Sequence, residues 1–279
     1  MSDIKGPTPP LAHLRSLLFA PGSDEPKLMK ALASDADAVV ADLEDAVTPD
    51  RKEAARELIL RLRPRVVRVN GADTRWFAED VAATAELELE ALVLPKATPD
   101  AVAALGADGP PVIAIVETAQ GLRLAYETAS SPRVAALLVG AADLGAALGW
   151  EPRADGLEVL YARSKVVTDS AAAGIRAPFD IVHTDTRDDA GLEASARFAR
   201  SLGFRGKACI HPAQVPIVNR VFEPETESLD WARRVIDAAE AGEREGRGAV
   251  ALDGEMIDLP VVERARRILA EAKGATHDH

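Results

Sequence analysis

The feature that most constrains the fold of this chain is a regular alternation of short apolar runs with longer amphipathic segments. The runs are rich in Val, Ile and Leu and end in Gly or polar positions, a pattern typical of buried parallel strands. Strand candidates occur at residues 16–22, 36–45, 65–70, 91–96, 111–118, 135–144, 179–185 and 206–212.

The segments between these runs carry apolar residues at spacings of three and four, which predicts helices. The clearest are residues 24–34, 49–63, 74–88, 121–131, 157–174 and 189–203. Repeated strand-then-helix units over about 220 residues predict an α/β fold, specifically a (β/α)8 or TIM barrel. The alternative is a doubly wound open sheet. Its usual Gly-rich turn is missing, because Pro21-Gly22-Ser23 does not match that motif.

The chain continues beyond the eighth strand candidate. We expect a barrel over residues 1–222 and a C-terminal extension over 223–279 that is not an independent domain. Within the extension, residues 228–245 and 261–273 are predicted helices, and 248–260 are predicted to be extended or a hairpin. Such an extension would cover the barrel mouth as a lid or pack on a neighbouring subunit.

Composition narrows the possible partners. The 279 residues carry a net charge of −12 without a basic block, which argues against nucleic acid or an anionic membrane as the main partner. The single cysteine, Cys209, excludes an internal disulfide framework and fits a reducing compartment. No segment resembles a signal peptide or a membrane span, so a cytoplasmic location is expected.

Polar residues cluster at the predicted carboxyl ends of the strands, which meet at one mouth of a barrel. They are Asp42, Glu44, Asp45, Arg68, Asn70, Lys96, Glu117, Asp143 and His211. Glu117 and Asp143 follow successive strands, and carboxylates suit Mg²⁺, which takes few protein ligands and keeps positions for substrate oxygens. Metal chelation of a keto acid stabilises a developing enolate or alkoxide, as carbon–carbon cleavage or Claisen condensation requires. Arg68 can grip a carboxylate through two hydrogen bonds.

Each of these residues also has an ordinary structural interpretation. Either acid alone can be an ion-pair member or lie beside a helix N-cap. Lys96 can form an imine, although the nearby charges favour a structural ion pair. His211 can merely cap the eighth strand, and Cys209 can be a small core residue. At least one acid of the segment ADLEDA is expected to orient Arg68.

Several motifs together resemble a known family. The motifs RSLLFAPGS, DADAVVADLEDAV, VVRVNG, LVLPK, IVETAQG, LLVGAADL, GKACIHPAQV and MIDLPVVERAR extend from about residue 15 to 270. They are similar to the citrate lyase beta subunit-like group of the HpcH/HpaI aldolase superfamily. The resemblance implies a TIM barrel, dependence on Mg²⁺ (with Mn²⁺ as an alternative) and CoA-thioester substrates such as citryl-CoA, malyl-CoA or citramalyl-CoA. It also implies that Glu117 and Asp143 bind the metal and that Arg68 holds the substrate carboxylate.

The resemblance assigns roles to further residues. Lys27 and Lys30 match lysines that contact the CoA phosphates in some relatives, although they can equally form a solvated helix face. Asp258 matches an aspartate that reaches in from an adjacent subunit and acts on the acetyl-CoA methyl proton; the alternative is a helix-start aspartate. Glu44, Asp45 and Lys96 are expected to support the site. The chain has Ala142-Asp143 where the family often has Glu-Asp, so the surroundings of the metal can differ.

The resulting hypothesis is a Mg²⁺-dependent carbon–carbon lyase or Claisen-type enzyme acting on a 3-hydroxyacyl-CoA. The metal-bound keto acid would be oxaloacetate, glyoxylate or pyruvate, and the assembly a homotrimer. One alternative is an aldolase acting on a free keto acid and an aldehyde. Another is an accessory barrel of a multi-subunit citrate lyase that uses an acyl-carrier protein. The residues do not distinguish the acyl-CoA or the favoured direction.

Overall fold

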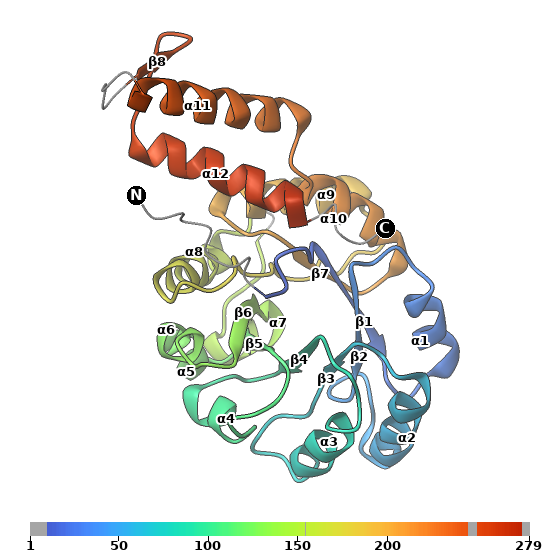
Figure 1. Ribbon diagram of the computed structural model, residues 1–279. Helices are drawn as coiled ribbons and strands as arrows, with labels where there is room; N and C mark the ends of the chain where they lie inside the picture. The colour runs from blue at the N-terminus through green and yellow to red at the C-terminus, as the bar shows by residue number, and fades with distance from the viewer. Residues whose placement is uncertain (1–9, 154, 245–249, 275–279) are drawn as a thin grey trace. The chain divides into compact units, whose positions relative to one another are not determined.

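The strand and helix alternation produces a curled parallel β-sheet with helices outside it (Figure 1). The computed structural model describes residues 10–153, 155–244 and 250–274. Contacts divide the chain into two compact units, one spanning Pro9–Phe222 and the other containing Glu223–His279. The sheet belongs to the first unit.

The sheet has seven strands in the order β6-β5-β4-β3-β2-β1-β7, and neighbouring strands are parallel. The strands are β1 (Ser16–Pro21), β2 (Ala38–Asp42), β3 (Val66–Arg68), β4 (Ala91–Leu94), β5 (Val112–Val116), β6 (Val134–Val139) and β7 (Lys207–Cys209). Except between β1 and β7, each strand pairs with its neighbour in sequence. The carboxyl ends of the strands therefore share one edge of the sheet.

Both faces of the sheet are buried, which explains why its strands are continuous apolar runs. Leu18 and Ala41 face the core between the sheet and the helices. Leu17 and Val40 belong to a second core on the other face. Side chains alternate between the two cores because successive residues of a strand point to opposite faces.

Helices and short turns connect these strands. They are α1 (Glu25–Leu32), η1 (Pro49–Arg51), α2 (Lys52–Leu62), α3 (Phe77–Thr84), α4 (Pro99–Ala103), α5 (Ala119–Arg123), α6 (Ala125–Ala129), α7 (Ala141–Leu148), α8 (Leu157–Ala172), α9 (Asp189–Leu202), η2 (Pro212–Gln214) and α10 (Val215–Phe222). Several begin at side chains that accept a backbone N–H: Asp24 caps α1, Thr98 caps α4 and Thr118 caps α5.

Two strand predictions were wrong in detail. The strand predicted over 135–144 ends at Val139, and α7 begins at Ala141 because Leu144 and Gly145 bury one face of a helix there. The predicted strand 179–185 is reduced to two isolated bridges, Phe179 with Leu138 and Asp180 with Lys207. The polar residues that follow, from His183 to Arg187, are half-buried or exposed and extend neither pairing.

Two helix predictions also differ from the structure. The segment 121–131 forms two short helices, α5 and α6, which meet at Leu124. The helix predicted over 74–88 is shortened to Phe77–Thr84. The helices α4 and α10 were not predicted, although the Thr98-Pro99 pair ahead of α4 is a recognisable start signal.

The second unit is a helical hairpin with a small β-ribbon. It contains α11 (Thr226–Arg244), the antiparallel pair β8 (Val250–Leu252) and β9 (Glu255–Ile257), and α12 (Leu259–Gly274). These elements agree with the two helices and the hairpin predicted for this part of the chain. Ala232, Val235, Ile257, Val262 and Ala265 form its core. Among the described residues, no helix has the length and apolar content needed to cross a bilayer.

Candidate active site

A cavity of about 490 Å³ lies at the carboxyl ends of the strands. One part of its lining is apolar and includes Phe19, Ile115, Leu138, Val182 and Ala208. The charged part consists of Asp42, Asp45, Arg68, Glu117 and Asp143. The cavity therefore combines an apolar wall with a concentrated set of carboxylates around one guanidinium.

Glu117 follows the last residue of β5 and is buried. Its Oε1 accepts the backbone N–H of Lys96 at 2.8 Å. Burial and the charge of Glu44 raise the pKa of Glu117 to about 7. Gly140 leaves space for this side chain, since a Cβ at that position would lie 2.5 Å from Glu117 Cβ and 2.6 Å from its Oε2.

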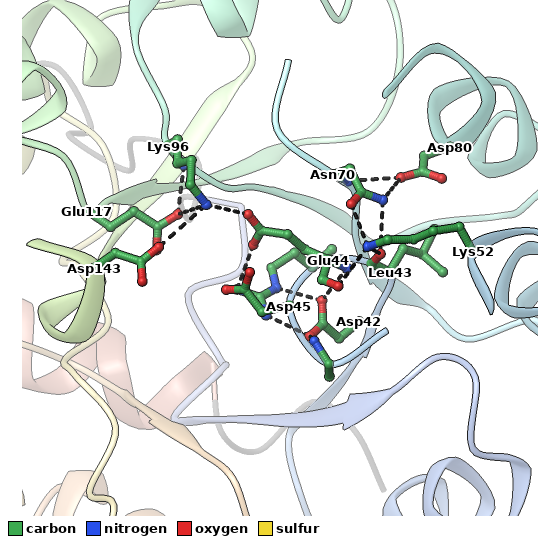
Figure 2. Close-up of polar contacts among 12 residues, drawn as sticks. Asp42, Leu43, Glu44, Asp45, Lys52, Asn70, Asp80, Lys96, Glu117 and Asp143 are labelled. Carbon is green, nitrogen blue, oxygen red and sulfur yellow. Dashed lines mark hydrogen bonds and ion pairs between the residues drawn. The ribbon is translucent and has the colours of Figure 1, made fainter. Parts of the chain in front are cut away.

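Asp143 reaches the same cavity from the first turn of α7, which begins where β6 ends. Its side chain is 42% exposed, and its Oδ2 lies 3.4 Å from Lys96 Nζ. Figure 2 shows the carboxylates of Asp143 and Glu117 side by side, facing Lys96. The sequence thus predicted their proximity correctly, although Asp143 lies in a helix and not at the end of a strand.

The ammonium group of Lys96 forms ion pairs with three carboxylates. Its Nζ lies 2.6 Å from Glu44 Oε1, 3.4 Å from Asp143 Oδ2 and 3.9 Å from Glu117 Oε1. Burial alone would lower the pKa of Lys96, but the hydrogen bond to Glu44 and the other carboxylates raise it above its ordinary value. The ammonium is therefore charged at neutral pH, and the ion-pair interpretation of Lys96 is the one the geometry supports.

Arg68, the last residue of β3, is held by acids at the carboxyl end of β2 and in the loop after it. Its Nε and Nη2 donate to the two carboxylate oxygens of Asp42 at 2.7 and 2.6 Å. Its Nη1 lies 2.9 Å from Glu44 Oε2 and 3.8 Å from Asp45 Oδ2. Asp42 is thus the residue of ADLEDA that orients Arg68, as expected. The ring of Phe19 lies 5.2 Å from the guanidinium carbon.

A buried lysine behind this cluster was missed in the sequence. Lys52 Nζ donates to the carbonyls of Leu43 and Glu44 at 2.6 and 2.8 Å, and to Asn70 Oδ1 at 2.7 Å (Figure 2). It therefore fixes the backbone of the loop that carries the acids. A lysine at the start of an amphipathic helix looks like any surface lysine, so no local pattern indicates this role.

The other predicted residues occupy varied positions. Lys27 and Lys30 are exposed on α1, and Lys27 pairs with Asp24 at 2.8 Å. His211 caps η2 through its Nδ1, which accepts the Ala213 N–H. Cys209 is buried, and burial raises the pKa of its thiol to about 12, consistent with a core residue.

Asp258 lies in the second unit, immediately before α12. Its Oδ1 accepts the backbone N–H of Val261 at 3.2 Å, so it performs the helix-start role that was the alternative to a catalytic one. Its side chain is exposed. An N-cap uses one carboxylate oxygen and leaves the other available.

The donor set suits a hard divalent cation. Within the described residues, no group of three or more His, Cys, Asp or Glu side chains is arranged to hold a metal. Mg²⁺ does not require one, because it is commonly bound by one or two carboxylates and completes its shell with water or substrate oxygens. Glu117 and Asp143 supply such a pair, and the absence of a side chain at Gly140 preserves the room beside Glu117 Oε2.

These features define the class of protein. A curled parallel sheet with acidic and basic side chains gathered around a cavity at the carboxyl ends of its strands is the arrangement of an α/β enzyme.

Comparison with known proteins identifies the family. Residues 15–212 match the family model described as HpcH/HpaI aldolase/citrate lyase. The chain is 40% identical over 275 residues to (3S)-malyl-CoA thioesterase from Cereibacter sphaeroides, covering 94% of this chain and 96% of the relative. It is 34% identical over 285 residues to citrate lyase subunit beta from Escherichia coli, covering 93% of each. This chain belongs to the HpcH/HpaI aldolase/citrate lyase family, and it is an enzyme of the CoA-ester lyase type.

A solved structure agrees with this membership. CitE from Mycobacterium tuberculosis in complex with magnesium, acetoacetate and coenzyme A superposes with a TM-score of 0.80. It is 37% identical, and the match covers 94% of this chain and 100% of that one. The α/β fold is therefore shared over nearly the whole length.

Proposed function

We propose that this enzyme is a Mg²⁺-dependent carbon–carbon lyase that cleaves a 3-hydroxyacyl-CoA thioester into a keto acid and an acyl-CoA. Citryl-CoA, malyl-CoA and citramalyl-CoA are the candidate substrates, and oxaloacetate, glyoxylate and pyruvate the corresponding keto acids. The observation that carries the proposal is the pair Glu117 and Asp143 beside Arg68 in one cavity. The complex of CitE with magnesium, acetoacetate and coenzyme A supports the same combination of ligands.

Glu117 and Asp143 would hold the metal, with Mn²⁺ as a possible substitute. When bound, the ion supplies Lewis-acid polarisation of the substrate oxygens. Glu117 is fixed for this role by the backbone N–H of Lys96. Glu44 and Asp45 support the arrangement through their ion pairs with Arg68, and Glu44 also pairs with Lys96.

Arg68 would bind the substrate carboxylate. A guanidinium has five N–H donors. Three of its nitrogens contact Asp42 and Glu44, each within 2.9 Å. The remaining N–H groups can serve one further carboxylate, and Asp42 fixes their direction.

In the cleavage direction the substrate hydroxyl would give its proton to solvent, its oxygen would become the carbonyl oxygen of the keto acid, and the bond between C2 and C3 would break. The electron pair of that bond moves to the α-carbon of the thioester, where an acid must deliver a proton. We assign that proton transfer to Asp258 of an adjacent subunit in a homotrimer. Its position in the segment between β9 and α12 and its exposed side chain are compatible with this role. In condensation the same carboxylate removes the proton.

Lys27 and Lys30 would contact the phosphates of CoA. The two ammonium groups are three positions apart on α1 and therefore share one face of the helix. Both side chains are exposed and able to meet an anionic ligand.

We also propose that the sheet closes into a (β/α)8 barrel through residues 179 and 180. Phe179 exchanges backbone hydrogen bonds with β6, donating to Leu137 O and accepting from Val139 N. Asp180 likewise donates to Gly206 O and accepts from Ala208 N of β7. These bonds support a short eighth strand between the two edges.

A second candidate function is hydrolysis of the thioester. It is favoured by the 40% identity to a (3S)-malyl-CoA thioesterase. Hydrolysis would release free hydroxy acid and CoA, whereas cleavage releases a keto acid and an acyl-CoA.

Product analysis separates these possibilities. The purified enzyme would be incubated with Mg²⁺ and malyl-, citramalyl- or citryl-CoA, and the products identified by mass spectrometry. We expect acetyl-CoA and a keto acid. Free hydroxy acid and CoA would establish the thioesterase, and failure with every CoA thioester would overturn the proposal.

A further inference from the structure

Lys96 forms ion pairs with Glu117 and Asp143, the two carboxylates that would hold the proposed metal. Its ammonium contacts Glu44, which follows β2, and also Glu117 and Asp143. Only the contact with Glu44, at 2.6 Å, has the length of a hydrogen bond. The 3.4 and 3.9 Å separations from Asp143 and Glu117 are ion pairs acting through charge alone.

The main chain of Lys96 is fixed independently of the ammonium. Its φ is +49°, in the left-handed region that a lysine rarely adopts, and its backbone N–H is bonded to Glu117 Oε1. Such a conformation persists only where its surroundings determine it. The side chain therefore starts from a fixed point beside Glu117, and removing it leaves the backbone bond to Glu117 in place.

The charges around Lys96 determine whether its ammonium strengthens or weakens the binding of a divalent cation. An ammonium a few ångströms from the two carboxylates neutralises part of their charge and repels a second cation. Glu44 keeps Arg68 as a partner when the ammonium is lost. Removal of the Lys96 charge therefore strengthens the attraction of Glu117 and Asp143 for a divalent cation. The Lys96 side chain is not needed to orient Glu117, because the backbone N–H of Lys96 holds that carboxylate.

We propose that Lys96 competes electrostatically with the metal and sets its affinity, holding Mg²⁺ binding weaker than the two carboxylates alone would give. The proposal rests on the assignment of Glu117 and Asp143 as the metal ligands. It makes Lys96 a residue that sets the metal affinity of this site through its charge. Its chemistry is that of a permanent positive charge and not that of a nucleophile.

Isothermal titration of the metal-stripped enzyme with Mg²⁺ tests the proposal. Lys96→Met removes the charge and keeps the side-chain length, and we expect the Kd for Mg²⁺ to fall by about tenfold or more. Lys96→Gly is the second variant, because glycine adopts a positive φ without strain and so favours folding. Lys165→Met, which removes the partner of Asp169 on α8 outside the cavity lining, is the matched control and should leave the Kd unchanged.

Thermal unfolding gives a second readout. Without metal, Lys96→Met should unfold at a lower temperature than wild type, because three carboxylates lose a counter-ion. Saturating Mg²⁺ should raise its midpoint more than that of wild type. A larger Mg²⁺-induced rise in the unfolding midpoint of Lys96→Met than of wild type supports competition between Lys96 and the metal.

The outcomes separate this inference from the proposed function. Absence of Mg²⁺ binding by the wild-type enzyme would remove the metal site and the inference with it. Binding by wild type together with an unchanged or weaker affinity in the Lys96 variants would overturn the inference alone. Tighter binding in both variants, with the Lys165 control unchanged, is the predicted result.

Discussion

Glu117 shows how far a single position could be predicted from sequence. The residue type and its place after an apolar run predicted a carboxylate at the cavity, and the structure has it there. Its burial and its bond to the Lys96 backbone were not predictable, because both depend on tertiary contacts, and the bond also depends on the left-handed conformation of Lys96 in another loop. Arg68 was predictable to the same extent. An acid of the segment ADLEDA was expected to orient it, and the structure shows that Asp42 accepts two hydrogen bonds from its guanidinium.

The pKa of Glu117 leads to a prediction about stability and pH. Burial raises it from an ordinary 4.5 to about 7, so the folded enzyme binds this proton more tightly than the unfolded chain. The resulting stabilisation is fully present below about pH 4.5 and is lost as the pH rises through about 7. At pH 8 and with a metal chelator present, the free energy of unfolding of Glu117→Gln should therefore exceed that of wild type by up to about 3 kcal/mol.

Urea unfolding at several pH values measures this effect. The advantage of Glu117→Gln should shrink as the pH is lowered toward 5. An advantage that is independent of pH, or a variant less stable than wild type at pH 8, would contradict the assigned environment of Glu117.

At the scale of elements, apolar runs predicted where strands lie better than where they end. The run through 135–144 continues into α7, since a helix that buries Leu144 is as apolar as a strand. The segment 179–185 was predicted as a strand, although only Phe179 and Asp180 pair with the sheet edges. Asp180 places its carboxylate between Arg163 and Lys207, and a sequence does not show such a buried ionic contact in advance.

The loop between β2 and α2 provides a test at this scale. Lys52 is buried and satisfies two loop carbonyls and Asn70 Oδ1. Lys52→Met should remove a charged donor from all three acceptors and destabilise the enzyme by about 2–4 kcal/mol. Leu43 O keeps the side-chain N–H of Asn70 and Glu44 O keeps the backbone N–H of Val47, so Asn70 Oδ1 is the acceptor most affected. Lys30→Met, an exposed lysine on α1, is the control and should change the stability by less than about 0.5 kcal/mol. Equal stability of the two variants in chemical denaturation would show that Lys52 does not anchor the loop.

At the scale of the whole molecule, the order of elements was largely predictable, including the two helices and ribbon of the second unit. Their hydrophobic periodicity is local and needs no knowledge of the tertiary structure. The catalytic role of Asp258 is different. It depends on assembly, which local patterns do not encode, and it remains a proposal.

Subunit mixing tests that proposal. Asp258→Asn and Glu117→Gln should each abolish turnover. Co-expressed as mixed oligomers, they should recover part of the activity, because some sites then combine an intact Asp258 with an intact Glu117. No recovery in verified mixed oligomers would place Asp258 in its own subunit's site. Full activity of Asp258→Asn alone would remove it from the mechanism.

The proposed function depends above all on a Mg²⁺ site formed by Glu117 and Asp143 in this cavity. Calorimetric titration of metal-stripped wild type, Glu117→Gln and Asp143→Asn with Mg²⁺ tests it most directly, with circular dichroism confirming that each variant is folded. Each substitution keeps the shape of the side chain and removes its charge. We expect binding by wild type and loss of binding in both variants. Unchanged Mg²⁺ affinity in the two folded variants would contradict the assignment of Glu117 and Asp143 as metal ligands.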